Sequence, residues 1–250
     1  MKKILFLLFV MSVSVFVAQT NEELFDKANA QYKEGNYQEA INLYTQIESE
    51  SVASSALYFN LGNCYYKLNN VANTIYNYEK ALILDPLNND ASNNLEFARR
   101  MTIDNIEELP KTFLQRIEIN YIKKFSYNQW SVFATVFSFL FALLFILFYI
   151  SKNSNKKRIY FLTSMFSLLF LIVTVVISYN QYSRFINTKT GIIFSSKVDV
   201  HNAPTLNSDE IFILHEGTKI FILDSVDNWK KIKLADGKIG WISADALKEL

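Results

Sequence analysis

Histidine and cysteine, which supply many of the nucleophiles, bases and metal ligands of proteins, are scarce in this sequence of 250 residues. The chain has two histidines, His201 and His215, and one cysteine, Cys64. A zinc site needs three or four such ligands at short spacings, which these positions do not provide. The histidines could approach each other across neighbouring strands, but without a third ligand we interpret them as surface residues.

Other signatures of catalysis are also missing from the sequence. None of its six glycines forms a phosphate-binding loop or a nucleophile elbow, and no carboxylate stands in a recognisable catalytic setting. Cys64 falls among the packing positions of an expected helix, so we interpret it as a small buried hydrophobe rather than a nucleophile. The sequence therefore predicts no enzymatic activity, no metal and no cofactor.

The composition combines regions typical of soluble proteins with regions typical of membrane proteins. Half of the residues are hydrophobic, yet 20% are charged. Residues 21–110 contain 14 acidic and six basic side chains, which gives a net charge of −8. A nucleic-acid-binding module shows the opposite pattern, a basic face on a folded domain, so we expect no nucleic-acid partner.

The N-terminus has the order of a secretory signal peptide. Lys2 and Lys3 precede an apolar run over residues 4–17, and the small Ala18 follows. The run is short for a membrane span. We therefore expect a signal peptide over residues 1–18, cleaved after Ala18; the alternative is a buried N-terminal helix.

Two further apolar runs are long enough to cross a membrane. Residues 130–150 and 159–179 each contain 21 residues without a charge. As helices they would be about 32 Å long, which matches the hydrocarbon core of a bilayer. Tyrosines and a tryptophan stand near their ends, as is typical of the membrane–water boundary. We expect a transmembrane helical hairpin in a lipid bilayer; the alternative is a buried hairpin in a soluble protein.

The stretch between the two runs is polar and basic. Residues 151–158 contain four bases and no acid: Lys152, Lys156, Lys157 and Arg158. Basic residues beside membrane spans stay on the cytoplasmic side, so we expect these four to determine the topology, with 151–158 as a cytoplasmic loop. Residues 19–125 and 183–250 would then both lie in the periplasm, in a protein of the bacterial inner membrane.

Residues 21–88 repeat with a period of 34. Small residues recur at Ala28 and Gly62, and bulky ones recur at Tyr44 and Tyr78. This period resembles the tetratricopeptide repeat, which implies an α-helical module over residues 19–108. We expect repeats at about 21–54 and 55–88, followed by a capping helix over 89–101.

The resemblance to tetratricopeptide repeats implies binding rather than catalysis. Stacked first helices form a concave groove that accepts an extended peptide or a helix of a partner protein. The positions that would face this groove are Phe25, Asn29, Tyr32, Phe59, Asn63 and Tyr66. Because the region is acidic and aromatic, we expect an apolar or basic segment of the partner. For Tyr32 and Tyr66 the alternative is simple packing between helices.

Residues 109–126 form a linker with amphipathic character. Its apolar side chains have helical spacing, with basic residues between them: Phe113, Leu114, Ile117, Tyr121 and Ile122. This pattern is typical of a helix that lies on a membrane surface. The alternative is a linker helix packed on the repeats.

From residue 190 the pattern changes to short alternating runs separated by turns such as Asp236-Gly237. This region resembles the bacterial SH3-like domain at Gly217, Trp229, Gly237, Gly240 and Trp241. The resemblance implies a small all-β SH3-like barrel over residues 190–250. Trp229 and Trp241 could form a ligand platform, but a small barrel needs large core side chains, and we favour the core.

The order of these parts resembles the BatE family of the Bacteroides aerotolerance operon. The strings NNLEFARR and SYNQW are also similar to that family. The resemblance implies a multidomain, non-catalytic scaffold of the inner membrane that is linked to oxidative-stress tolerance. Its expected partners are membrane-anchored von Willebrand factor A proteins. The alternative, from a different class, is a peptidoglycan-binding sensor or regulator of cell-wall hydrolases.

The expected topology can be tested with a compartment reporter inserted within residues 151–158. The reporter should read out as cytoplasmic, because the positive charges keep this stretch on that side of the membrane. The same reporter placed after the SH3-like region should read out as periplasmic. A periplasmic signal from 151–158 would overturn the topology.

Overall fold

The computed structural model describes residues 21–107 and 109–250. The chain divides into two compact units. One unit contains the helical repeats together with the C-terminal sheet, and the other contains residues 109–189 together with residues 85–87. The expected signal peptide, residues 1–18, lies outside the described residues.

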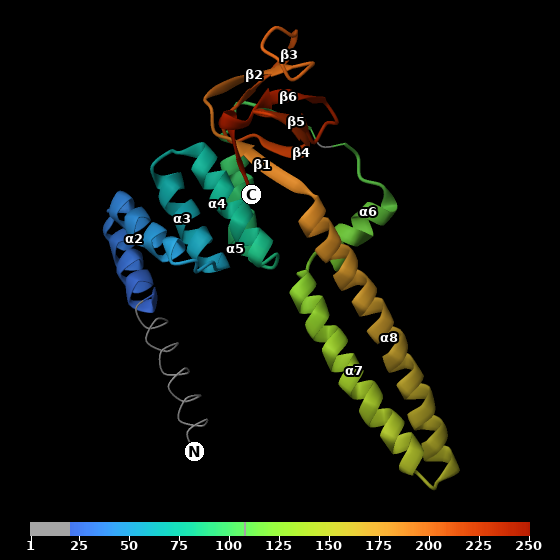
Figure 1. Ribbon diagram of the computed structural model, residues 1–250. Coiled ribbons are helices and arrows are strands. Elements are labelled where there is room, and N and C mark those ends of the chain that lie inside the picture. The colour runs from blue at the N-terminus through green and yellow to red at the C-terminus, as the bar shows by residue number, and fades with distance from the viewer. Residues whose placement is uncertain (1–20, 108) are drawn as a thin grey trace, which may run out of the picture. The chain divides into compact units, whose positions relative to one another are not determined.

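The helices of the N-terminal module follow the period of the sequence. Residues 21–34 are helical, and then come α2 (Tyr37–Ser49), α3 (Ser55–Lys67), α4 (Val71–Leu84) and α5 (Asn89–Arg99). Figure 1 shows α2 to α5 side by side in chain order.

The turns inside the two helical hairpins share one backbone conformation. The φ angle is +85° at Gly35 and +59° at Asn69, and these positions are 34 residues apart. The left-handed region is open to glycine and, among other residues, is most accessible to asparagine and aspartate. Asn69 therefore takes the place of the glycine in the second turn. The residue after α4, Asp85, is followed by Pro86, which cannot continue a helix.

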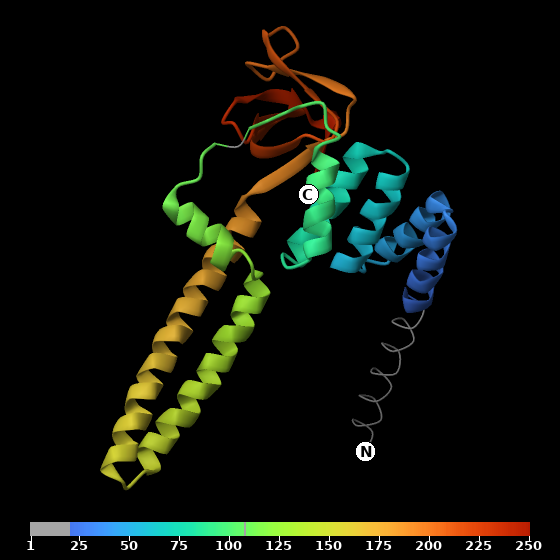
Figure 2. The ribbon, with the colours of Figure 1, turned by 180° about the vertical axis from the view of Figure 1, so that it is seen from behind.

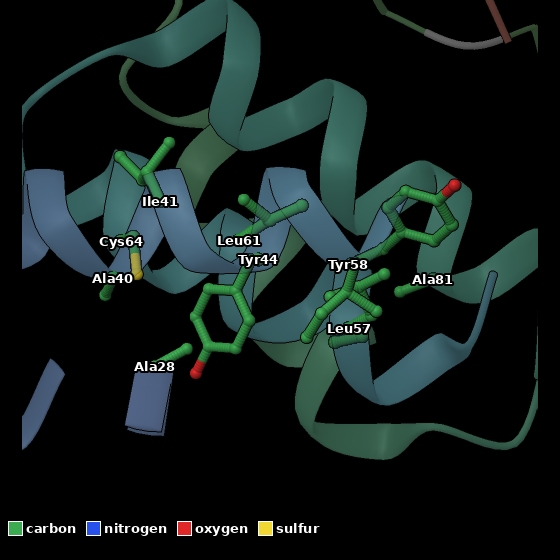
Figure 3. Close-up of a cluster of buried hydrophobic side chains, with 11 residues drawn as sticks. Ala28, Ala40, Ile41, Tyr44, Leu57, Tyr58, Leu61, Cys64 and Ala81 are labelled. Carbon is green, nitrogen blue, oxygen red and sulfur yellow. The ribbon is translucent and has the colours of Figure 1, made fainter. Parts of the chain in front are cut away.

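Tyrosine rings and small residues pack together in the core of the repeats. Tyr44 and Tyr78 are 0% and 1% exposed. A Cβ atom on Gly62 would lie 2.5 Å from the ring of Tyr78, closer than real Cβ contacts. Figure 3 shows Tyr44 and Cys64 among the aliphatic side chains of one buried cluster. The small residue at position 62 is therefore required by the ring that packs on it.

The C-terminal module is an antiparallel sheet. Its strands are β1 (Lys189–Ile193), β2 (Lys197–His201), β3 (Glu210–His215), β4 (Lys219–Val226), β5 (Trp229–Lys233), β6 (Ile239–Ser243) and β7 (Leu247–Glu249), with the short helix η2 (Ala244–Ala246) before β7. Within the described residues the seven strands have the order β3-β2-β6-β5-β4-β1-β7. The helical repeats and the all-β module confirm the expected fold class.

The sheet packs on the helical repeats through an apolar contact inside their common unit. Ile192 of β1 belongs to a buried cluster with Ile75 of α4 and Ala98 of α5. The ring of Phe194 packs edge-to-face on Tyr76, with the centroids 5.7 Å apart. The two modules therefore share a core, which the sequence patterns did not indicate.

A buried carboxylate also joins the two modules. The side chain of Glu79 on α4 is 7% exposed and forms ion pairs with Arg99 of α5, at 2.8 Å, and with Lys219 of β4, at 2.6 Å. Burial raises the pKa of this carboxyl group, but the two cations outweigh burial and hold the pKa below its ordinary value of 4.5. Glu79 is therefore charged at neutral pH and binds Lys219 to the helices.

The segment after α5 is fastened to the same sheet. The carboxylate of Asp104 accepts a hydrogen bond from the backbone amide of His215 at 2.7 Å and from the hydroxyl of Thr218 at 2.6 Å. Its other oxygen contacts Nδ1 of His215 at 2.8 Å. Burial raises the pKa of Asp104, but these hydrogen bonds lower it further, to below its ordinary value of 3.8. Ile106 then packs on the apolar core of the sheet.

The second unit is built on an antiparallel hairpin of α7 (Tyr127–Ile150) and α8 (Ser154–Asn187), which both views show (Figures 1 and 2). Within the described part of the chain, these two helices are long and apolar enough to cross a membrane. Only 6% and 17% of their most apolar windows are buried. Core helices of soluble proteins are mostly buried, so this exposure is compatible with membrane spans.

The connection between the two helices is shorter than the expected loop over residues 151–158. Only residues 151–153 separate α7 from α8. The side chain of Asn153 accepts hydrogen bonds from two amides of the next turn and so starts α8 early. Residues 156–158, three of the four bases expected in the loop, therefore lie on α8, and Lys152 remains in the loop.

Small and hydroxyl side chains fill the contact between α7 and α8. The buried ones include Ala134, Ser164, Ser167 and Thr174. The hydroxyl of Ser167 donates to the backbone carbonyl of Phe137 across the hairpin, at 2.9 Å. Close approach and interhelical hydrogen bonds stabilise helix pairs in lipid, where the hydrophobic effect does not drive their association.

Replacing Glu79 with glutamine should loosen the sheet from the helices. A neutral amide cannot form the ion pairs with Arg99 and Lys219, and losing a buried charge-assisted contact costs about 1–3 kcal/mol. Hydrogen–deuterium exchange of the full chain should become faster over residues 215–219. Glu96→Gln is the matched control, because the side chains of Glu96 and Arg100 are 71% and 66% exposed and such pairs contribute little.

The same ion pairs predict a pH dependence. A carboxylate whose pKa is lowered by folding stabilises the folded state fully above its ordinary value, here 4.5, and loses this effect as the pH falls through the lower folded value. After correction for intrinsic exchange rates, the wild type should approach Glu79→Gln at acidic pH and differ from it at neutral pH. Equal exchange of the two proteins at neutral pH would contradict the role of Glu79.

Candidate functional site

The six residues expected to face a groove lie on the first helix of each repeat. Three belong to helical residues 21–34 and three to α3: Phe25, Asn29 and Tyr32, then Phe59, Asn63 and Tyr66. Tyr66 is 39% exposed, and the other five are half-buried. All six therefore keep part of their surface in contact with solvent.

The aromatic members of this set also contribute to packing. The ring of Tyr32 packs edge-to-face on Tyr37, with the centroids 5.4 Å apart. The ring of Phe59 lies 6.0 Å from that of Tyr78. Packing between helices, the alternative considered for Tyr32, therefore coexists with its partial exposure.

The first repeat contains a hydrogen-bonded triad of side chains. Oδ1 of Asn29 accepts hydrogen bonds from the hydroxyl of Tyr44, at 2.6 Å, and from Nδ2 of Asn60, at 3.0 Å. Burial raises the pKa of Tyr44, so its hydroxyl stays protonated and donates. The triad links the first helix of the repeat to its second helix and to α3.

The second repeat contains the same triad 34 residues later. Oδ1 of Asn63 accepts from the hydroxyl of Tyr78, at 2.7 Å, and from Nδ2 of Asn94, at 3.0 Å. Because a carbonyl oxygen has two lone pairs, Oδ1 is then saturated in both triads. Within the described residues, Nδ2 of Asn29 and Nδ2 of Asn63 donate to no side chain or carbonyl. Both amide groups are therefore left as donors for a ligand.

A cavity of about 210 Å³ lies beside the second triad. Its lining residues are Tyr32, Asn63, Tyr66, Lys67, Tyr78, Asn94 and Phe97. Of the six expected groove residues, the structure brings three together here, whereas Phe25, Asn29 and Phe59 lie outside this lining.

Four lining residues were not among the expected groove positions. Tyr78 was expected only as core bulk, and Lys67, Asn94 and Phe97 were not expected at all. Asn94 could have been found from the period, because it lies 34 residues after Asn60 and repeats its role. Lys67 and Phe97 follow from the packing of α3 against α5, for which the repeat pattern gives no signal.

The charge of the cavity differs from the overall charge of the repeats. Lys67 is the charged residue in its lining, which contains no carboxylate. A basic segment of a partner, one of the two options expected from the acidic composition, therefore finds no counter-charge here. The aromatic and amide lining favours the other option, an apolar segment.

The two histidines do not meet, because they lie at opposite ends of the paired strands β2 and β3. His201 is 7% exposed, and its ring packs edge-on to Trp229. His215 is held by Asp104. The expectation that both are surface residues was therefore wrong. Among residues 21–107 and 109–250, no group of three or more His, Cys, Asp or Glu side chains is placed to hold a metal ion.

Cys64 is buried in the core of the repeats, with 0% of its surface exposed. Burial raises the pKa of its thiol to about 12. The thiolate is the nucleophilic form of cysteine, and at neutral pH it is scarce at such a site. The interpretation of Cys64 as a small buried hydrophobe is confirmed.

Trp229 and Trp241 lie half-buried, outside the core of the sheet. That core is aliphatic and consists of Ile193, Val200, Leu214, Ile220, Ile222, Ile232, Leu234 and Ile242. Trp241 stands opposite Lys231 of β5, whose ammonium group is 5.7 Å from the ring centroid. The favoured core role is therefore not met, and a ligand platform at these two rings stays a hypothesis.

Comparison with known families identifies both soluble modules. Residues 196–248 match the bacterial SH3 domain, and residues 55–88 match the tetratricopeptide repeat. The chain as a whole matches no curated protein. Both domain types are typically non-catalytic interaction modules, so the matches support binding to proteins or to peptidoglycan.

The single cysteine offers a test of the packing behind the cavity. Gly62→Ala places a methyl group against the ring of Tyr78, and overpacking should outweigh the gain in helix propensity by about 1–2 kcal/mol. The repeats should then open more often. The rate at which a thiol reagent modifies Cys64 in the native full-length protein should rise about 5- to 30-fold.

Ser92→Ala, at an exposed position of α5, is the control for this experiment and should leave the labelling rate unchanged. If Gly62→Ala also labels at the rate of the wild type, the space beside Tyr78 accepts a methyl group and the packing argument fails.

Proposed function

We propose that this protein is a membrane-anchored scaffold that binds an extended segment of a partner protein in the groove of its tetratricopeptide repeats. The observation that carries the proposal is the repeated triad, which leaves amide donors on Asn29 and Asn63 one repeat apart. An extended chain offers backbone carbonyls at regular intervals, so fixed donors bind it without reading its side chains.

The cavity beside Asn63 selects the chemistry of the bound segment. Tyr66 and Phe97 are 39% and 55% exposed and provide apolar contact area. The neighbouring Lys67 is the charged group of the lining. An apolar segment fits this surface, because its side chains cover the rings while its backbone accepts from the amides.

The helical hairpin anchors the scaffold in the inner membrane of a bacterium. The bases at positions 152 and 156–158 face the cytoplasm in this proposal, following the positive-inside rule. Both soluble modules then work in the periplasm, where a bacterial SH3 domain is compatible with the surroundings.

The partners are proteins of an envelope complex in this proposal, and the scaffold itself performs no reaction. The resemblance to the BatE family points to membrane-anchored von Willebrand factor A proteins among the partners. It also suggests a link to aerotolerance or oxidative stress.

A peptidoglycan-binding sensor or regulator of wall hydrolases is the second candidate. The half-buried rings of Trp229 and Trp241 favour it, because aromatic faces with an amphipathic edge bind sugars and peptides. In this case residues 190–250 hold the ligand, and the groove of the repeats is secondary.

Photo-cross-linking in membranes tests the groove. A photoreactive residue in place of Phe97, at the exposed edge of the cavity, should trap a partner protein, whereas one in place of Asn42 on α2 should not. The double variant Tyr32→Ala and Tyr66→Ala should weaken capture roughly tenfold or more, because truncating aromatic anchors removes most of the binding energy. Capture that survives this double variant would rule out the groove.

Binding to purified sacculi separates the two candidates. Under the scaffold proposal, the full-length protein in detergent binds sacculi weakly, and Trp229→Ala with Trp241→Ala leaves its cross-linked partner unchanged. Strong binding to sacculi that is lost in this double variant would favour the peptidoglycan-binding function instead.

A further inference from the structure

Residues 111–125, here named the juxtamembrane segment, are folded rather than extended. They contain α6 (Phe113–Ile117) and a short π-helix, η1 (Glu118–Ile122). Thr112 and Gln115 form a reciprocal capping box at the start, with hydrogen bonds of 2.8 and 3.4 Å. Such a cap fixes where the helix begins, so the segment enters α7 with a defined geometry.

Contacts with both membrane-type helices hold the segment in place. The backbone carbonyl of Ile122 accepts from the indole of Trp130 on α7, at 3.0 Å, and from the side-chain amide of Gln181 on α8, at 2.8 Å. The carboxylate of Glu118 forms an ion pair with Arg184 of α8. The juxtamembrane segment is therefore fastened to one end of the hairpin.

That end of the hairpin carries a cluster of aromatic rings. Phe125, Trp130 and Phe133 pack on one another with centroids 5.4 to 5.7 Å apart. Tyr127 packs edge-to-face on Tyr182 at 5.5 Å. Aromatic belts of this kind mark the membrane–water boundary, so the attached segment lies at the level of that boundary.

The large apolar side chains of the segment are exposed. Phe113, Leu114 and Tyr121 are 75%, 74% and 69% exposed, comparable with 74% for Phe139 in the middle of α7. The segment carries charged residues, whereas α7 carries none, so the hydrocarbon core cannot receive it. Exposed apolar side chains on a charged helical segment fit the layer between headgroups and acyl chains.

The charge of the segment is positive. Lys111, Arg116, Lys123 and Lys124 stand against one acid, Glu118, which already binds Arg184. Clusters of lysine and arginine beside a membrane span attract anionic headgroups. Charge and exposed apolar surface therefore point to the same partner, an anionic bilayer surface.

We propose that the juxtamembrane segment lies on the bilayer, inserts Phe113, Leu114 and Tyr121 among the acyl chains, and binds anionic lipid headgroups through Arg116 and Lys124. The inference rests on the proposed placement of α7 and α8 in the membrane. A docking protein is the competing occupant, but a boundary position beside an aromatic cluster and directly before a span favours lipid.

A fluorescent probe on Phe113→Cys in the full-length protein tests the proposal. Cys64 is buried and stays unlabelled. In nanodiscs that contain phosphatidylglycerol, emission from the probe should shift to the blue and be quenched by lipids brominated near the headgroup. Both effects should diminish in pure phosphatidylcholine and at high salt, because salt screens the attraction. The same probe on Asn42→Cys, an exposed position of α2, is the aqueous reference.

The double variant Arg116→Gln and Lys124→Gln should abolish the difference between the two lipids while the blue shift in phosphatidylglycerol decreases. Emission at position 113 that equals the aqueous reference in both lipids would overturn the proposal. A probe that is aqueous in nanodiscs yet shielded in native membranes would also overturn it and would identify a protein as the occupant.

Alkaline extraction of the membranes separates this inference from the placement on which it rests. If the protein is released, α7 and α8 are not membrane spans and the anchoring proposal fails. If the protein is retained while the probe at position 113 stays aqueous, only the contact between the segment and the lipid surface is wrong.

Discussion

The ring of Tyr78, packed in the space beside Gly62, is the contact on which the soluble unit depends. A single methyl group at position 62 would lie 2.5 Å from that ring. The hydroxyl of the same tyrosine fixes Asn63 through a hydrogen bond of 2.7 Å, and the ring also lines the cavity. One side chain therefore fills the core, orients an amide donor and shapes the surface that a partner would contact. Tyr44 has the corresponding contact with Asn29 in the first repeat.

Successive residues of α4 connect this groove to the C-terminal sheet. Tyr78 contacts α3, whereas the next residue, Glu79, binds Arg99 of α5 and Lys219 of β4. A buried carboxylate between two cations is stabilising only while all three groups stay together, because removing one partner leaves an uncompensated charge. The repeats and the sheet consequently share one helix, and a partner in the groove would contact the element that also holds the SH3-like module.

The second unit obeys different physics. Along most of α7 and α8 the side chains are apolar and exposed, so their stability requires a solvent that resembles them. Small and hydroxyl residues let the two helices approach closely, and Ser167 supplies a hydrogen bond between them. At one end, the carbonyl of Ile122 accepts from groups on both helices, which turns a short linker into part of the anchor. Charge is confined to the ends of the hairpin, where water is available.

The sequence by itself determined the kinds of element and their order. The period of 34, the uncharged runs and the glycine-rich turns depend on residue size, charge and local backbone freedom, which is why Gly35 and the helix end before Pro86 could be located without coordinates. Only the tertiary structure decided which distant groups meet. Glu79 binds a lysine 140 residues away, and Asp104 binds a histidine 111 residues away. It also decided that branched aliphatic side chains, rather than the two tryptophans, fill the core of the sheet. Such pairings depend on how completed elements pack, so no local or periodic pattern in the sequence records them.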